Sequence, residues 1–421
     1  MNRNTFWAAL GKALAIVTVT FIVVVTLAPS TSAASKFKTV YKFTGGADGS
    51  QPLARLILDA AGNLYGTTYV GGAGWGTVFE LTPNADGSWT ETVLHSFTCD
   101  DDGFGPVAGL VLDATGNLYG TASVYGTRLY GAVFQLTPHS ERGWTKTELH
   151  SFGGWDGNYP FADLIFDQAG KLYGITHGGG NSGAGQVYEL TPNGDGSWAE
   201  SSPHFFNVWD GVYPYADLIF DEAGNLHGTT YQGGNLSACS GQGCGVVFKV
   251  MPNPDESWTA SVLHSFSGAD GSNPLAGLIF DTAGNLYGTA EVGGLFGHGV
   301  VFKLRPNPDG TWSERVLHQF TGGKDGGEPF GGLIFDKAGN LYGTTYQGGS
   351  LTACSGDGCG VVFKLTPKSN GGWKEAVLHR FVDHPGARPS AGLILDAAGN
   401  LYGTTAGDGT ATFGSVFEIT P

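Results

Sequence analysis

The sequence has little positive charge and almost no methionine, and each of these features argues against particular partners or folds. Lys and Arg total 21 against 37 Asp and Glu, which gives a formal net charge of −16. Nucleic acids and anionic membranes are bound through clustered basic residues, so neither is expected as a partner. Only 2 of the 421 residues are Met, whereas 71 are Gly and 12% are aromatic. That composition is typical of short strands joined by tight turns and argues against a helical bundle.

Familiar catalytic signatures are also absent from the sequence. It contains no G-x-S-x-G nucleophile elbow, no H-E-x-x-H zinc motif and no phosphate-binding loop that leads into a helix. The sequence therefore favours a binding or interaction module over an enzyme.

The N-terminal segment predicts export. Arg3 and Lys12 flank a short polar start, residues 13–28 are apolar apart from threonines, and Ser32-Ala33-Ala34 offers a cleavage site. We expect residues 1–34 to be a signal peptide and the mature protein to be periplasmic, cell-surface or secreted. An uncleaved membrane anchor is the alternative, because sixteen apolar residues fall just short of a spanning length. No hydrophobic tail precedes Pro421, so we expect no membrane span in the mature chain.

Cysteine is scarce, and four of the five cysteines lie in two near-identical loops. In an exported protein the spacing predicts two local disulfides, Cys239–Cys244 and Cys354–Cys359. A metal site is the alternative, but two thiols per loop without a nearby His make a poor ligand set. Cys99 is left over, either free or buried.

One strand-rich motif dominates the rest of the chain. It reads L-I-F-D-x-A-G-N-L-Y-G-T and recurs seven times at intervals of 54 to 60 residues. Each copy continues through G-V-V-F-K-L-T-P to W-T-E-x-V-L-H-S-F, which makes four short strands per copy. We therefore predict an all-β fold over residues 35–421, a single seven-bladed β-propeller. The motif aspartates are Asp59, Asp113, Asp167, Asp221, Asp281, Asp336 and Asp396.

The two ends of the chain share one repeat. The last copy stops at Pro421 after its third strand, and the missing fourth strand is found at residues 36–43, where T-V-Y-K-F matches V-L-H-S-F. We predict that residues 36–43 complete the last blade and close the ring. An open β-solenoid, which would not need a shared first and last unit, is the alternative architecture.

These blocks resemble a known bacterial repeat family. The combination of D-x-A-G-N-L-Y-G-T-T, G-x-V-F-K-L-T-P and V-L-H-S-F is similar to the tandem repeats of the GloVer (Gloeo-Verruco) family, over essentially the whole chain after the signal. The D-x-x-G-N-L-Y hairpin alone is similar to NHL-type propeller repeats, which is a weaker match. The resemblance implies an exported protein and no particular activity.

Repetition separates scaffold residues from candidate site residues. The motif aspartates, six fourth-strand histidines and six tryptophans recur in equivalent places, so we expect turn, hydrogen-bonding and packing roles for them. The histidines are His95, His150, His204, His264, His318 and His379, and the tryptophans are Trp89, Trp144, Trp198, Trp258, Trp312 and Trp373.

A D-G loop before each repeat is a better candidate for function, because it should lie at one rim beside the channel. Its aspartate either caps a turn or joins a ring of carboxylates that concentrates a cation such as Ca²⁺. The seventh copy departs from the pattern and reads Asp383-His384-Pro385. The six aspartates are Asp48, Asp102, Asp156, Asp210, Asp270 and Asp325.

Two adjacent D-G loops break the symmetry with aromatic residues. Trp155, Tyr159, Trp209 and Tyr213 could stack on pyranose faces, while Asp156 and Asp210 accept hydrogen bonds from hydroxyls. Further loop residues on this rim are Trp75, Tyr125, Arg128, Tyr130, His177, Glu291 and His298.

A monomer that binds a glycan or a surface protein at this rim is our leading hypothesis, with carbohydrate preferred. The alternatives are a polysaccharide hydrolase or lyase that uses the rim carboxylates, and a purely structural cell-surface protein. If the large side chains of this rim merely pack over loop backbones, the rim binds no ligand.

Overall fold

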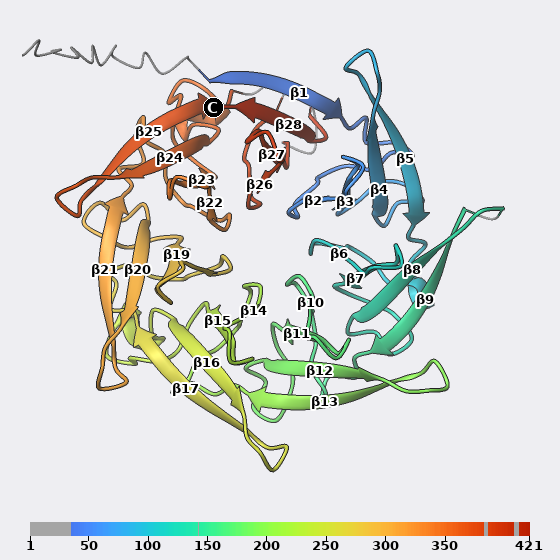
Figure 1. Ribbon diagram of the computed structural model, residues 1–421, viewed down its shortest axis with the longest axis horizontal. Coiled ribbons are helices and arrows are strands. Elements are labelled where there is room, and N and C mark those ends of the chain that lie inside the picture. Colours follow the sequence, from blue (N-terminus) through green and yellow to red (C-terminus); the bar gives the residue numbers. More distant parts are fainter. Residues whose placement is uncertain (1–34, 142, 383–385, 408–411) are drawn as a thin grey trace, which may run out of the picture. The chain divides into compact units, whose positions relative to one another are not determined.

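Seven four-stranded antiparallel sheets surround a central axis, as blades of a β-propeller (Figure 1). This computed structural model describes residues 35–421 apart from 142, 383–385 and 408–411, so the predicted signal lies outside the described residues. The predicted seven-bladed propeller is confirmed. Among the described residues, no helix is long and apolar enough to cross a bilayer.

Each blade has the same four strands, numbered here from the axis outward. The inner strands are β2 (Ile57–Leu58), β6 (Val111–Leu112), β10 (Ile165–Phe166), β14 (Ile219–Phe220), β18 (Ile279–Phe280), β22 (Ile334–Phe335) and β26 (Ile394–Leu395). The second strands are β3 (Leu64–Thr68), β7 (Leu118–Ala122), β11 (Leu172–Thr176), β15 (Leu226–Thr230), β19 (Leu286–Ala290), β23 (Leu341–Thr345) and β27 (Leu401–Thr405).

The third and outer strands are longer. The third strands are β4 (Thr77–Pro83), β8 (Ala132–His139), β12 (Gln186–Pro192), β16 (Val246–Pro252), β20 (Val300–Pro306), β24 (Val361–Pro367) and β28 (Ser415–Thr420). The outer strands are β5 (Trp89–Ser96), β9 (Gly143–Ser151), β13 (Trp198–Phe205), β17 (Trp258–Ser265), β21 (Trp312–Gln319), β25 (Trp373–Arg380) and β1 (Lys36–Lys42). Blades are numbered 1 to 7 by their inner strands, so blade 7 contains β26, β27, β28 and β1.

The first strand of the chain closes the ring, as predicted. Strand β1 pairs antiparallel with β28 from Lys36 opposite Thr420 to Lys42 opposite Ser415. The closing interface is also bonded near the axis, where the Thr404 hydroxyl donates to the carbonyl of Ala54 at 3.1 Å. Blade 7 therefore contains strands from both ends of the described chain (Figure 1).

Neighbouring blades are held together by a repeated aromatic contact. A Phe at the end of each outer strand packs edge-on against the ring on the third strand of the next blade, as Phe266 does on Phe302 at 5.1 Å. The closing interface uses Phe43 on Phe79, also at 5.1 Å. The equivalent pairs in the other five interfaces are Phe97–Phe134, Phe152–Tyr188, Phe206–Phe248, Phe320–Phe363 and Phe381–Phe417.

The glycine of each L-Y-G-T segment is a consequence of this contact. At Gly288, a Cβ atom would lie 2.6 Å from the edge of the Phe302 ring and 2.8 Å from Leu278. Any side chain here would displace the third-strand aromatic ring, which is fully buried. The motif therefore carries a glycine in each copy, because the aromatic ring of the third strand occupies the space that a side chain would need.

Replacing Phe43 by Ala should weaken ring closure. Phe43 is 4% exposed, and Phe-to-Ala changes in cores cost about 3–5 kcal/mol because they lose apolar burial and leave a cavity. Thermal melting should show a clear fall in Tm. Lys36→Ala, on the exposed side of the same strand, is the control and should leave Tm nearly unchanged. Equal melting of Phe43→Ala and wild type would contradict a closed ring.

Candidate functional site

The two rims of the propeller carry different connections. One rim holds the tight turns between the first two and the last two strands of each blade. The other holds the loops from second to third strand and the D-G loops into the next blade, and we call it the loop rim. In each case the two kinds of loop pair with one another, as in the bridges Ser50–Val70 of blade 1 and Val212–Gln232 of blade 4.

Exposed apolar side chains gather on the loop rim. Among the described residues, every exposed large hydrophobic side chain except Leu112 and Val262 lies there. Loops held on a rigid scaffold commonly carry binding residues, so this rim is the candidate interaction surface. The residues are Trp75, Tyr125, Leu129, Tyr130, Trp155, Tyr159, Val208, Trp209, Tyr213, Leu295, Phe296, Leu351 and Val382.

The motif aspartates belong to the opposite rim and shape its turns. The Asp281 carboxylate accepts the backbone N–H groups of Ala283 and Asn285, both at 2.9 Å, and the side-chain amide of Asn285 at 2.7 Å. Tyr287 donates its hydroxyl to the same carboxylate at 3.0 Å. Every donor comes from the same hairpin, so these residues serve the scaffold.

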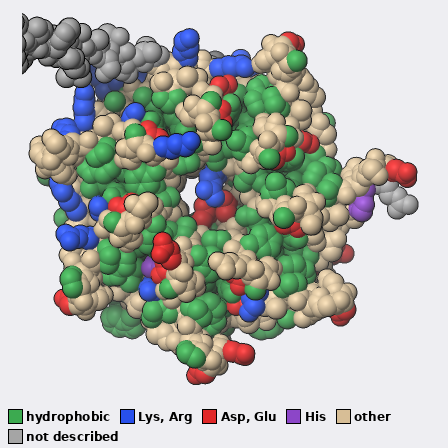
Figure 2. All heavy atoms as spheres, viewed as in Figure 1, with side chains coloured by type: hydrophobic (Ala, Val, Ile, Leu, Met, Phe, Trp, Pro, Cys, Tyr) green, Lys and Arg blue, Asp and Glu red, His purple; other side chains and the backbone are tan. Residues whose placement is uncertain are grey.

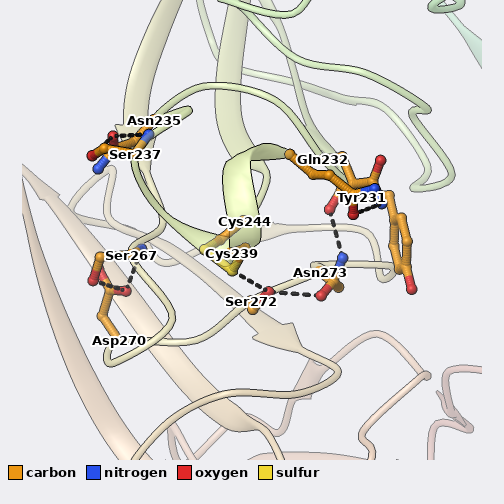
Figure 3. Close-up of a disulfide and its surroundings, with 11 residues drawn as sticks. Tyr231, Gln232, Asn235, Ser237, Cys239, Cys244, Ser267, Asp270, Ser272 and Asn273 are labelled. Carbon is orange, nitrogen blue, oxygen red and sulfur yellow. Dashed lines mark hydrogen bonds between the residues drawn. A yellow bond between two sulfur atoms is a disulfide. The ribbon is translucent and has the colours of Figure 1, made fainter.

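The D-G aspartates are turned into their own loops. Asp270 accepts the N–H of Ser267 at 2.8 Å (Figure 3). Its carboxylate also lies 3.0 Å from Nε2 of His264 on the outer strand before it. The same outer-strand histidine contact holds Asp102, Asp156, Asp210 and Asp325, and Tyr41 replaces the histidine at Asp48.

This geometry changes the interpretation of the carboxylates. Asp156 is only 1% exposed and is also 3.5 Å from Arg128, so it is not available to a sugar hydroxyl, contrary to the expectation from sequence. Asp210 makes the same loop and histidine contacts but is partly exposed. Within the described ranges, no group of three or more His, Cys, Asp or Glu could hold a metal ion. The seventh loop, Asp383–Pro385, lies outside the described residues, and cation concentration at the rim stays a prediction.

Trp155 and Trp209 are the most exposed aromatic side chains of the two adjacent loops. Each is 70% exposed. In the part of the chain that the structure describes, neither ring contacts Tyr159 or Tyr213. The tryptophans therefore lie apart from the tyrosines with which the sequence grouped them.

The chain enters blades 3 and 4 through two matching columns of side chains. In blade 3 the alternate residues are Tyr159, Phe161 and Asp163, and in blade 4 they are Tyr213, Tyr215 and Asp217. Tyr159 and Tyr213 have positive φ angles of 55° and 59°, and the chain bends at Ala162 and Ala216. Each column therefore consists of two aromatic residues followed by an aspartate along the chain that enters the blade.

The two columns join into a continuous aromatic wall. Phe161 and Tyr215 are parallel across the blade interface, with centroids 5.4 Å apart and an interplanar angle of 5°. His177, from the end of β11, stacks 4.7 Å from Tyr213 and lies 4.3 Å from Tyr215. Tyr159 stacks on Phe161 at 6.0 Å. Burial lowers the pKa of His177 to about 4, so its ring is neutral at physiological pH.

Charged side chains meet at the axis below this wall. At the position where four blades carry glycine, blades 1, 3 and 4 carry Arg55, Asp163 and Asp217. Arg55 reaches past blade 2 to Asp163 at 3.2 Å, and Asp163 donates its backbone N–H to Asp217 at 2.8 Å. The second oxygen of Asp163 accepts the N–H of Gly109 at 2.5 Å. Figure 2 shows basic and acidic side chains together at the central opening.

The pKa shifts follow from this arrangement. Burial opposes the charge of Arg55, but the carboxylates of Asp163 and Asp217 outweigh it and raise the pKa of Arg55. Burial raises the pKa of Asp217, and the negative charge of Asp163 raises it further while Arg55 lowers it in part. Asp217 is partly accessible from the channel, so it can exchange hydrogen bonds there.

Sequence reasoning found the tyrosines but missed Phe161, Tyr215 and the axial charges. The available signal is the block Y-P-[F/Y]-A-D, which occurs only in blades 3 and 4. Its aspartate replaces a glycine that most other repeats carry. A departure from glycine at a repeated position is as informative as an added aromatic residue.

The other predicted rim residues are spread around the mouth. Trp75 packs edge-on against Phe104 at 5.1 Å, and the ring of His298 covers Gly322. Tyr125 and Tyr130 are exposed. Burial and the nearby charge of Glu328 raise the pKa of Glu291 to about 7.

Two disulfides stiffen loops on this rim. Cys239 is bonded to Cys244 and Cys354 to Cys359, while Cys99 is free and partly buried. The first disulfide lies against the D-G loop of the next blade, where its sulfur is 3.3 Å from the Ser272 hydroxyl (Figure 3).

The chain belongs to the Gloeobacter/Verrucomicrobia repeat family, whose profile matches residues 23–242 and 236–421. No curated protein matches the sequence.

Solved structures give distant likenesses. A protein from Thermus thermophilus, assigned as an oxidoreductase (glucose dehydrogenase), is 15% identical over 92% of this chain and 100% of its own, with a TM-score of 0.44. A gluconolactonase from Xanthomonas campestris is 16% identical over 73% of this chain and 82% of its own, with a TM-score of 0.40. Likenesses this distant carry no argument about activity.

A glutamate on the outer strand lies near the D-G aspartate in several blades. In blade 5, burial raises the pKa of Glu314 to about 7, His264 lowers it in part, and the charge of Asp270 raises it further. In blade 1, burial and the charge of Asp48 raise the pKa of Glu91 to about 7. The folded protein thus holds these protons more tightly than the unfolded chain. The stabilisation provided by the protonated carboxyls of Glu314 and Glu91 is complete below about pH 4.5 and is lost as the pH rises through about 7.

Glu314→Gln, which is neutral at every pH, should reveal this linkage. We expect the variant to have a Tm close to wild type at pH 4.5. At pH 8 its free energy of unfolding should exceed that of wild type by about 1 kcal/mol, which is less than the full pKa shift implies because the carboxyl is partly exposed. Thermal melts at the two pH values measure the difference. Glu91→Gln provides a matched repeat in blade 1. A difference in Tm that does not change with pH would show that the carboxyl carries no linkage.

Proposed function

We propose that this protein is an exported carbohydrate-binding module whose ligand seats against the aromatic wall of blades 3 and 4. The observation that carries the proposal is the wall itself, in which Phe161, His177, Tyr213 and Tyr215 present stacked rings at the mouth of the channel. Pyranose rings have apolar faces that stack on aromatic side chains, and their hydroxyls bond to polar groups beside them.

The surroundings support this ligand class over others. Carboxyl groups of Asp217 at the axis and Glu291 at the rim can bond to hydroxyls. Trp155 and Trp209, further out on the same loops, could contact a longer chain. A bulk net charge of −16 disfavours polyanionic ligands.

Binding should be tested with cello-, malto-, xylo- and chito-hexaose by isothermal titration calorimetry. Tyr213 is 37% exposed, so Tyr213→Ala should fold normally and weaken binding by about tenfold through the loss of one stacking ring. Trp75→Ala, on the same rim in blade 1, is the control and should bind like wild type.

The outcomes separate the alternatives. Binding by none of the four sugars would remove the carbohydrate proposal, and equal binding by wild type and Tyr213→Ala would move the site elsewhere. A weaker affinity in Trp155→Ala/Trp209→Ala would extend the site outwards. Release of new reducing ends from a bound sugar would favour a hydrolase.

Export has its own test. Fractionation of a producing culture, followed by mass spectrometry of the intact protein, should recover a chain outside the cytoplasm that begins near Ser35. The segment 1–34 fits a cleaved signal because its apolar run is short and is followed by small residues. A membrane-bound chain that retains residues 1–34 would favour the anchor instead.

A further inference from the structure

The aromatic wall leads to a polar floor. Phe161 and Tyr215 come two residues before Asp163 and Asp217 on the same two entering chains. Arg55 lies beside this floor and is joined to Asp163. A ligand seated against the wall therefore meets charged groups at the axis.

The floor is closed on the side of blade 2. Arg55 extends from blade 1 to blade 3, and Gly109 of blade 2 donates its N–H to the Asp163 carboxylate beneath it. A Cβ atom on Gly109 would lie only 2.9 Å from this carboxylate. The glycine is thus required by the bridge between Arg55 and Asp163, which spans the axial side of blade 2.

The floor also leaves hydrogen-bonding groups unused. Both oxygens of Asp163 are taken, by Gly109 and Arg55. One oxygen of Asp217 accepts the Asp163 N–H, and among the described residues no partner is found for its other oxygen. Arg55 likewise directs only one nitrogen at Asp163, and its side chain is 45% exposed. One carboxyl oxygen of Asp217 and several guanidinium N–H groups of Arg55 are therefore available to a ligand at the axis.

We propose that this site takes the end of a glycan chain, a terminal pyranose held end-on, and not an internal segment; this inference rests on the proposed carbohydrate function. A terminal residue carries adjacent free hydroxyls that can accept from Arg55 and donate to Asp217, while its face stacks on the wall. In an internal residue one of those positions is a glycosidic bond, so one of these hydrogen bonds is lost.

A substitution on the opposite side of the channel can be used to fill the site. Gly332 of blade 6 occupies the same axial position, its φ is not in the left-handed region, and a Cβ atom there would have no neighbour closer than 3.7 Å. Gly332→Leu can therefore be accommodated and would fill space at the floor without touching the wall. Gly194→Leu is a matched control, because nothing lies within 4 Å of a Cβ atom at Gly194 on the opposite rim.

The test uses calorimetry with the trimer to the hexamer of cello-, malto-, xylo- and chito-oligosaccharides. End-on binding predicts that Kd per chain stops changing with length, to within about twofold, once the chain is long enough to reach Trp155 and Trp209, because each chain has one such end. Gly332→Leu should weaken binding by about tenfold or more, and Asp217→Asn should weaken it measurably, while Gly194→Leu binds like wild type. All three variants should melt within a few degrees of wild type, as a check on folding.

Two results would overturn the inference while leaving carbohydrate binding intact. One is an affinity that rises in proportion to the number of internal residues. The other is undiminished binding by a folded Gly332→Leu. Binding of none of the sugars would instead overturn the proposed function, and this inference with it.

Discussion

The edge-on contact between a phenylalanine that ends one outer strand and the aromatic ring of the next blade is the interaction on which the whole ring depends. A four-stranded blade has two faces and cannot bury both by itself, so its stability comes from its neighbours. The contact is made at all seven interfaces, with centroids 4.9 to 5.4 Å apart. Phe43 supplies the seventh, which is why the fold needs the strand that the last repeat lacks.

The same packing decides where residues are free to vary. The second-strand glycine and the third-strand aromatic residue constrain one another, so neither can carry function. At the axis, the entering chain is outside the four-stranded sheets, and the fold repeats no single side chain at this position. Glycine in four blades leaves the channel open there, and Arg55, Asp163 and Asp217 occupy it on one side. The asymmetry of the site thus lies where the symmetric scaffold imposes no requirement.

Repetition was a reliable guide to scaffold residues and a weaker guide to the site. It assigned Asp281 and its equivalents to turns, and Asp281 caps its turn in the structure. It assigned His264 to hydrogen bonding within the blade, whereas His264 contacts Asp270 of the loop that leads into the next blade. It left the D-G aspartates as ligand candidates, because a sequence does not show that the histidine six or seven residues earlier points at the same carboxylate. Once that contact is made, Asp156 is enclosed and its charge is used within the loop.

The number of blades, the order of strands and the closing strand could all be predicted from the sequence, because these follow from local strand patterns and from a repeat that is divided between the two ends. Tyr159 and Tyr213 could also be recognised there as departures from symmetry. Which of these departures meet depends on the folded arrangement of the blades. Trp155 is four residues from Tyr159 yet lies outside the wall, whereas Phe161, Tyr215 and His177 come together from two blades. Their meeting depends on how far each blade rotates about the axis, and that rotation is set by packing between blades, which no local pattern in the chain encodes.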